Sequence, residues 1–151
     1  MTADAVYADP SALLKLYRME VESRAFAQWR FRNPEPVPLT LHGELEIVNA
    51  IELFLHRKAL TTAEARAATQ SFEEDLAGGR YRREDPGWRA VMRRSKGLTL
   101  AHTAGIGTRT LDVLHVASAL ELGLRHFLTF DERQSALAVR AGLKLVTIPV
   151  R

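Results

Sequence analysis

Short apolar runs alternate along the chain with longer segments whose apolar residues recur at helical spacing. The short runs predict β-strands at residues 5–9, 37–40, 126–130 and 143–150. The longer segments predict helices at residues 10–17, 21–31, 41–60, 61–77, 86–105, 110–122 and 131–142. Strands that alternate with helices favour a parallel sheet covered on both faces. We therefore predict a three-layer α/β/α fold with a central, mostly parallel sheet of about four to five short strands.

The composition fits a single domain that spans residues 1–151, because no repeat, low-complexity tract or linker divides the chain. The chain contains no cysteine, which excludes disulfide bonds and thiolate metal sites and favours a cytoplasmic location. No apolar run approaches the roughly 20 residues of a membrane span, and the beginning of the chain has no signal-peptide pattern. We therefore expect a soluble, cytoplasmic protein that does not associate with a membrane.

The net charge of +3 is too small to indicate a partner, but the charge is unevenly distributed. The segment from Arg80 to Lys96 holds seven basic residues and two acidic ones. A basic segment of this kind could contact nucleic acid or an acidic region of another protein. A solvated helix face and loop would explain it equally well, so the charge alone leaves both interpretations open.

Three aspartates occupy positions where the predicted elements meet. Asp9 and Asp131 each end a predicted strand, and Asp112 lies in the first turn of a helix that is apolar on nearly all sides. Each has an ordinary explanation, as a helix N-cap or as a charge favoured by the helix dipole. The carboxyl ends of parallel strands meet at one edge of a sheet, however, so we expect the three carboxylates to converge there.

Three converging carboxylates would repel one another unless a cation or shared protons intervened. Without cysteine or paired histidines, an all-oxygen site predicts a hard ion, Mg²⁺ or Mn²⁺. The predicted helix at 41–60 offers a fourth carboxylate, from either Glu44 or Glu46. Helical periodicity slightly favours Glu44 as the inward-facing residue, whereas Glu46 lies on a smaller and more mixed face. The residues by themselves leave this choice open.

Four motifs follow one another along nearly the whole chain: "YADPSALLKLY", "LHGELEIVNAI", "TLDVLHVASALELG" and "FLTFDERQSALA". Together they resemble the PIN-domain ribonucleases, and most closely the VapC-type toxins of bacterial toxin–antitoxin pairs. The resemblance implies that the second motif contributes Glu46 rather than Glu44. The implied catalytic and metal-binding residues are Asp9, Glu46, Asp112 and Asp131. Ser11 and Thr129 match polar positions near that site and would have a supporting role.

The same resemblance implies a Mg²⁺- or Mn²⁺-dependent endoribonuclease that leaves a 5′-phosphate and acts on structured RNA such as transfer RNA. It also implies a homodimer that a cognate antitoxin protein keeps inactive, with the apolar segments 12–17 and 25–31 available to pack a partner's helix. The basic residues that could contact RNA phosphates are Arg80, Arg82, Arg83, Arg93, Arg94 and Arg109.

Other functions share some of these features. A phosphoacceptor receiver domain also gathers aspartates at strand ends, but it needs an acidic pair after the first strand and a lysine after the last. A haloacid-dehalogenase-like phosphatase needs Asp-x-Asp after the first strand, where this chain has Asp9-Pro10-Ser11. A non-catalytic PIN-fold binding module would be expected to lack at least one of the four acids, and all four are present.

The histidines and tryptophans add less to the functional argument. His115 lies one turn after Asp112, and a packed, hydrogen-bonded histidine explains it better than a residue that lines the site. The other histidines are too scattered along the chain to form a metal site. We expect Trp29 and Trp88 to belong to the core or to an interface rather than to stack on bases.

Overall fold

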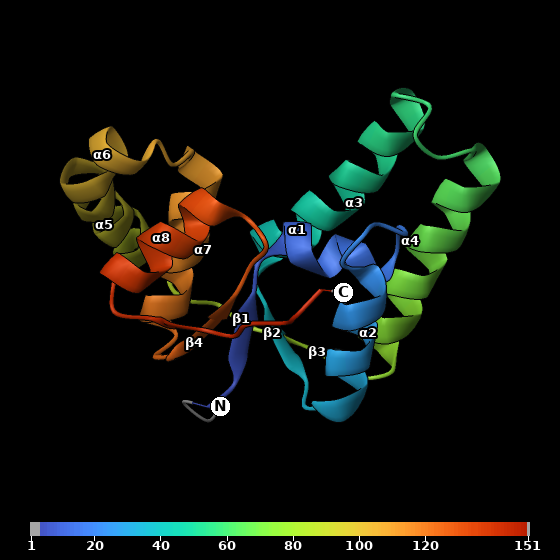
Figure 1. The fold of residues 1–151 in the computed structure, drawn as a ribbon, viewed down its shortest axis with the longest axis horizontal. Helices are drawn as coiled ribbons and strands as arrows, with labels where there is room; N and C mark the ends of the chain where they lie inside the picture. The colour runs from blue at the N-terminus through green and yellow to red at the C-terminus, as the bar shows by residue number, and fades with distance from the viewer. Residues whose placement is uncertain (1–3, 151) are drawn as a thin grey trace.

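The computed structural model of the protein describes residues 4–150, in which short parallel strands form two small sheets (Figure 1). The first sheet has the order β1 (Val6–Ala8), β4 (His126–Leu128) and β5 (Lys144–Leu145). The second pairs β2 (Val37–Leu39) with β3 (Tyr81–Arg83). In the first sheet Ala8 is paired with Leu128, so the carboxyl ends of β1 and β4 lie side by side.

Strands β1 and β2 are neighbours at the junction of the two sheets, yet no hydrogen-bonded ladder joins them. The N–H of Val37 donates to the carbonyl of Arg80, the residue before β3. The carbonyl of Leu39 accepts from the N–H of Glu84, the residue after β3. The N–H and C=O groups of successive strand residues point toward opposite neighbouring strands. Because Val37 and Leu39 bind the β3 side, the backbone of Pro38 faces β1. Proline has no N–H to donate, which removes one bond that could have joined the two sheets.

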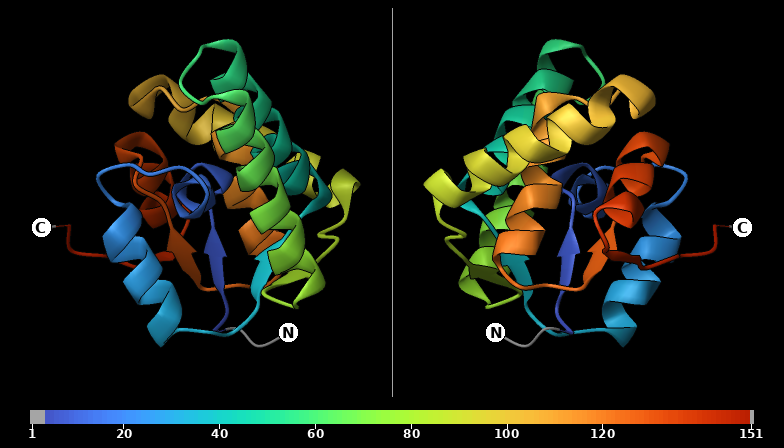
Figure 2. Two further views of the ribbon diagram at one scale, coloured as in Figure 1. Left: turned by 90° about the vertical axis from the view of Figure 1, so that its right-hand side faces the viewer. Right: turned by 90° about the vertical axis from the view of Figure 1, so that its left-hand side faces the viewer.

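Helices connect the strands and cover them. Their bounds are α1 Pro10–Leu13, η1 Leu14–Leu16, α2 Ser23–Arg32, α3 Leu41–His56, α4 Thr62–Ala77, α5 Trp88–Leu98, η2 Thr99–Thr103, α6 Ala104–Ile106, α7 Thr110–Glu121 and α8 Glu132–Arg140. Both views in Figure 2 show β1 and β4 in the interior, with helices in front of them and behind them. Within the described residues, none of these helices is both long and apolar enough to cross a membrane.

Alternating side chains of β1 and β4 pack into two different apolar clusters. Tyr7 and Phe127 point toward α7 and α8, where they meet residues such as Val116 and Leu137. Ala8 and Leu128, the next residues in each strand, belong instead to the larger cluster formed with α1 to α4. Because successive strand residues point to opposite faces, burial on both faces requires the nearly continuous apolar runs seen in the sequence.

The prediction of an α/β fold with parallel strands is confirmed, but several predicted elements differ in the structure. The single sheet is divided into two, and β3 lies within the basic segment, where the sequence indicated no strand. The strand predicted at 143–150 is reduced to Lys144–Leu145, and the chain beyond it is irregular. The helix predicted at 86–105 is divided into α5, the π-helical turn η2 and α6.

Arg30 ties the end of α2 to the segments that lead into both strands of the second sheet. Its guanidinium is buried and donates to three carbonyls, those of Asn33 and Glu35 at 2.6 and 2.8 Å and that of Arg80 at 2.9 Å. We expect Arg30→Ala to lower the free energy of unfolding by about 3 kcal/mol, because buried acceptors lose their donors. Urea denaturation would measure the change, with exposed Arg32→Ala on the same helix as the control. A loss as small as that of the control would contradict this account.

Candidate acidic site at the carboxyl end of the strands

Asp9 and Asp131 each follow a strand and cap the helix that comes next. Asp9 is buried, its N–H donates to the carbonyl of Leu128 at 2.9 Å, and its carboxylate accepts from the N–H and the hydroxyl of Ser11. Asp131 is exposed and accepts from the N–H of Gln134 at 2.7 Å. Thr129 accepts from the N–H of Asp131 at 3.1 Å, so its hydroxyl orients the backbone at the start of α8. The structure thus places both aspartates at one edge of the β1–β4 sheet.

Asp112 lies in the first turn of α7 and is half-buried beside these two residues. Its pKa is raised, first by burial and then by the negative charges of Asp9 and Asp131, while the backbone and the charge of Arg109 act in the opposite direction. The three aspartates therefore share one electrostatic environment. Within residues 4–150, none of the three has a basic side chain within ion-pair distance, so their repulsion is not offset by a local salt bridge.

Gln134 connects the three aspartate positions from the first turn of α8. Its side chain is fully buried, and its amide nitrogen donates to the Asp9 carboxylate at 3.1 Å and, more weakly, to the Asp112 carbonyl at 3.4 Å. Its backbone N–H holds Asp131, as described above. Its amide oxygen is buried and has no hydrogen-bond partner among the described residues. No local pattern in the sequence indicates that the side chain of Gln134 reaches Asp9, because the two residues are 125 positions apart.

Glu46 is directed toward α7, but it is bound to a histidine rather than to the aspartates. Its carboxylate lies 2.8 Å from Nε2 of His115, whose Nδ1 is 2.6 Å from the hydroxyl of Tyr7. Glu44 instead forms a two-point ion pair with Arg83 of β3, with both distances 2.9 Å. The side chains of Glu44 and Glu46 are similarly exposed, at 22% and 25%, so burial does not separate them. Their partners do, because Glu44 faces β3 and Glu46 faces α7.

Aromatic rings extend from His115 to the surface. His42 stacks on His115 and also packs against Trp88, with both centroid separations 4.7 Å. Burial, together with the charge of His115, lowers the pKa of His42 to about 4, so this ring is neutral at physiological pH. Trp88 is 41% exposed and is not a core residue, whereas Trp29 packs on Phe26 at the larger core cluster. The remaining histidines lie on separate elements, as their scatter in the sequence predicts.

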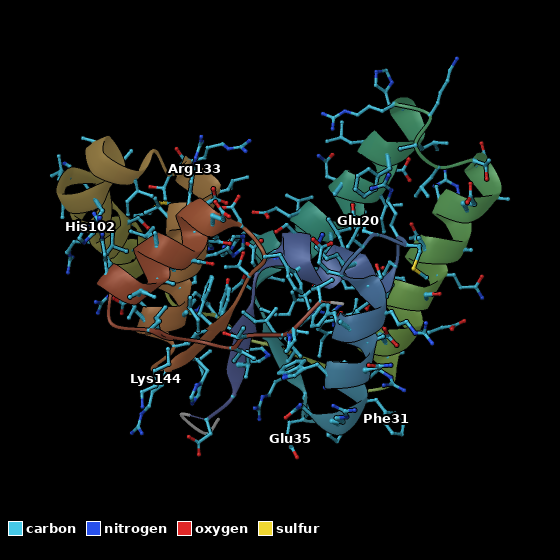
Figure 3. The ribbon with its side chains drawn as sticks, viewed as in Figure 1. Glu20, Phe31, Glu35, His102, Arg133 and Lys144 are labelled. Carbon is cyan, nitrogen blue, oxygen red and sulfur yellow. The ribbon has the colours of Figure 1, made fainter. Side chains whose placement is uncertain are left out.

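The arginines predicted to contact RNA divide into paired and unpaired groups. Four have a carboxylate partner: Arg80 with Asp75, Arg82 with Glu84, Arg83 with Glu44 and Arg94 with Glu121. Arg93 and Arg109 are exposed and have no ion-pair partner within the part of the chain that the structure describes. Arg109 begins α7, three residues before Asp112, and Arg133 is exposed close to Asp131 at the same end of the molecule (Figure 3).

The site offers only oxygen ligands from its acids, which suits a hard divalent cation. Over residues 4–150, however, no three acidic or histidine side chains approach closely enough to form a ready-made metal site. Burial contributes most to the raised pKa of Asp112 and the negative charges of Asp9 and Asp131 add to it, so a cation bound here would stabilise the ionised carboxylate. The donor set fits Mg²⁺ or Mn²⁺ in its chemistry.

Comparison with protein-family models and with curated proteins finds no match for the chain. The residues of this site and their geometry are therefore what indicates a function for the protein. Those residues form an acidic group at the strand ends, with Gln134 as a donor at its base and the Glu46–His115 pair on the neighbouring helices.

Proposed function

We propose that the protein is a Mg²⁺- or Mn²⁺-dependent endoribonuclease similar to the VapC-type PIN-domain toxins. The observation that carries the proposal is the group of three aspartates at the β1–β4 edge, where burial and then the charges of Asp9 and Asp131 raise the pKa of Asp112. Among residues 4–150, no basic side chain lies within ion-pair distance of the three. Bringing charges of one sign together destabilises a fold. Such clusters are therefore typical of sites that bind a cation or perform catalysis. The four motifs that resemble the PIN family supply the acids of this region.

The fold supports this proposal in one respect. Helices α7 and α8 pack on one face of β1 and β4, and helices α1 to α4 pack near the other. A three-layer, PIN-like single domain over residues 1–151 would have this organisation. It would place strand ends and helix starts, including the starts of α1, α7 and α8, around one acidic site.

A bound divalent ion would lower the pKa of an attacking water and balance charge on the scissile phosphate. Asp9, Asp112 and Asp131 would hold the ion through their carboxylates, and Gln134 would keep Asp9 and Asp131 in place. Glu46 would either complete the ligand set or accept the proton of the water. Ser11 donates to the Asp9 carboxylate and Thr129 accepts from the N–H of Asp131, contacts that support a positioning role for both.

Unpaired arginines near the acids would contribute most to RNA affinity, because their charge is not already balanced by a carboxylate. We expect Arg109→Ala to weaken RNA binding about fivefold and to reduce the dependence of log affinity on log salt by about 1. Arg94→Ala should change both quantities less, because Arg94 is paired with Glu121 at 2.7 Å. Fluorescence anisotropy with labelled RNA in chelator would measure binding without cleavage. Equal effects of the two substitutions would contradict a special role for Arg109.

The proposed partners are a cognate antitoxin and a second copy of the chain. An apolar groove beside α2 is lined by residues that include Leu16, Met19 and Phe31, together with Lys15 and Arg24. Met19 and Phe31 are 83% and 87% exposed, and Phe31 extends from the outer side of α2 (Figure 3). An amphipathic helix of an antitoxin would suit this groove, with apolar residues over Phe31 and acidic residues near the basic rim.

The proposed activity can be tested directly with end-labelled total transfer RNA. Purified protein would be incubated with Mg²⁺ or Mn²⁺, with chelator, and in parallel as the Asp112→Asn variant. Discrete fragments that require metal and disappear in the variant would support the proposal, and their ends would locate the cut. If neither protein cuts, calorimetric titration with Mn²⁺ becomes decisive. Failure of the wild-type protein to bind the ion would overturn the metal-dependent enzyme.

A further inference from the structure

His115 lies in α7, the helix that carries Asp112, and connects β1, which Asp9 follows, to Glu46 of α3. It is 1% exposed in the middle of α7, and both of its ring nitrogens are engaged. Nδ1 lies 2.6 Å from the hydroxyl of Tyr7 in β1, and Nε2 lies 2.8 Å from the Glu46 carboxylate in α3. A chain of hydrogen bonds thus runs from the sheet, through α7, to an acid of α3.

The direction of these hydrogen bonds follows from what each group can donate. Tyr7 is 2% exposed, and a phenol hydroxyl keeps its proton at neutral pH. An ionised carboxylate can only accept, so Nε2 of His115 must carry a proton to bind Glu46. In a neutral ring Nδ1 is then an acceptor, and the Tyr7 hydroxyl donates to it. Tyr7 thereby selects the tautomer of His115 that donates to Glu46.

The spacing of these residues places the chain of hydrogen bonds beside the aspartates. Tyr7 and Asp9 are two residues apart in an extended segment, so their side chains leave it on the same side. Asp112 and His115 are three residues apart in α7 and lie on one face of that helix. The segment formed by β1 and Asp9 and helix α7 therefore each supply one aspartate and one residue of the hydrogen-bonded series, which Glu46 joins from α3.

We propose that Tyr7 and His115 are positioning residues that fix the Glu46 carboxylate for the reaction. One oxygen of Glu46 is held by His115, and within the described residues the other has no protein donor. The inference rests on the proposed ribonuclease function, in which Glu46 binds the ion or accepts a proton. A rigidly oriented carboxylate serves either role better than a free one, because a mobile glutamate would have to be ordered in each turnover.

The geometry of the hydrogen bonds from Tyr7 through His115 to Glu46 can be tested without an activity assay. In ¹⁵N-labelled protein, the ring nitrogens of His115 should show a proton on Nε2 and a hydrogen-bonded, unprotonated Nδ1. Tyr7→Phe removes the donor to Nδ1 and should shift the Nδ1 resonance. Tyr17→Phe, which removes a half-buried hydroxyl that contacts Asp75 and Tyr81, should leave the His115 signals unchanged. A proton found on Nδ1 in the wild-type protein would overturn the proposed direction of donation.

The effect on the reaction is tested by kcat and KM for RNA cleavage. Tyr7→Phe should lower kcat about 10-fold with KM nearly unchanged, and His115→Phe should lower it about 100-fold. His115→Gln places an amide N–H near the position of Nε2 and should recover part of the loss. If His115 acts through Glu46, then His115→Phe should cost little further activity in a Glu46→Gln background.

Two outcomes would overturn the positioning role. One is an unchanged kcat in Tyr7→Phe, and the other is a His115→Phe substitution that lowers kcat as much in the Glu46→Gln background as in the wild-type protein. A His115→Phe variant that fails to fold would leave the Tyr7→Phe and His115→Gln comparisons to decide the matter. Absence of both RNA cleavage and Mn²⁺ binding by the wild-type protein would instead overturn the ribonuclease function. The NMR measurement distinguishes the two failures, because it reports the hydrogen bonds in protein that has neither metal nor RNA.

Discussion

Replacing Asp112 with asparagine is expected to lower the rate of metal-dependent RNA cleavage by about 1,000-fold. The substitution preserves the shape of the side chain and removes one negative charge from the group that would hold the cation. Asp112 is the best test of that group, because its pKa responds to both Asp9 and Asp131. Single-turnover cleavage of end-labelled RNA would measure the loss, and activity close to that of the wild-type protein would rule Asp112 out as a ligand.

The same substitution should have the opposite effect on stability in the absence of metal. The pKa of Asp112 is raised in the folded protein by burial and by neighbouring negative charges, so the folded state binds this proton more tightly than the unfolded chain. Its favourable contribution is therefore complete at low pH and is lost as pH rises through the unfolded and then the folded pKa. We expect metal-free Asp112→Asn to be more stable than the wild-type protein at pH 7, with the difference shrinking toward pH 3.

Added cation should reverse this order. At a free Mn²⁺ concentration of 100 Kd, a site that binds only the folded state gains about 2.7 kcal/mol. The wild-type protein should show a gain of that size in urea denaturation, and Asp112→Asn should show much less. Asp85→Asn, the same chemical change at an exposed turn, serves as the control and should respond to Mn²⁺ like the wild-type protein. Equal stabilisation of all three proteins would contradict an aspartate-held cation.

The parts of the structure that the sequence predicts are those with a local physical cause. The apolar runs that form β1, β2 and β4 are flanked by helix-starting residues, and Asp9 and Asp131 cap the helices that follow. A residue that directly follows a parallel strand and caps the next helix also lies at the edge of the sheet. The structural and the functional interpretation of these aspartates therefore agree on where they lie, and the sequence could place them before the fold was known.

The parts that the sequence does not predict depend on contacts between distant residues. Strand β3 consists of Tyr81 and two arginines and becomes a strand only because β2 offers an edge to pair with. Glu44 is drawn to Arg83, 39 residues away, which no helical wheel of α3 can show. The contact of Gln134 with Asp9 spans 125 residues, and that of His115 with Tyr7 spans 108. Composition and periodicity carry no information about such pairs.

Gln134→Glu should cause the largest loss of stability among single substitutions at the site. The change is nearly isosteric, but it replaces the amide that donates to Asp9 with a carboxylate oxygen in a fully buried position. One hydrogen bond becomes a repulsion between two buried negative charges, and we expect the metal-free protein to lose about 3 kcal/mol at pH 7. Urea denaturation in chelator would measure this loss.

Exposed Gln70 provides a matched control for this effect. Its amide also donates to a carboxylate, that of Glu74 at 3.0 Å, but on the solvated face of α4, so Gln70→Glu should cost only about 0.5 kcal/mol. Burial and the nearby aspartates would raise the pKa of a carboxyl at position 134 in the folded state. Its protonated form is then the stabilising one, so the loss in Gln134→Glu should diminish as pH falls toward 4. A loss that is equal in the two variants, or independent of pH, would show that the Gln134 amide does not hold the acidic group together.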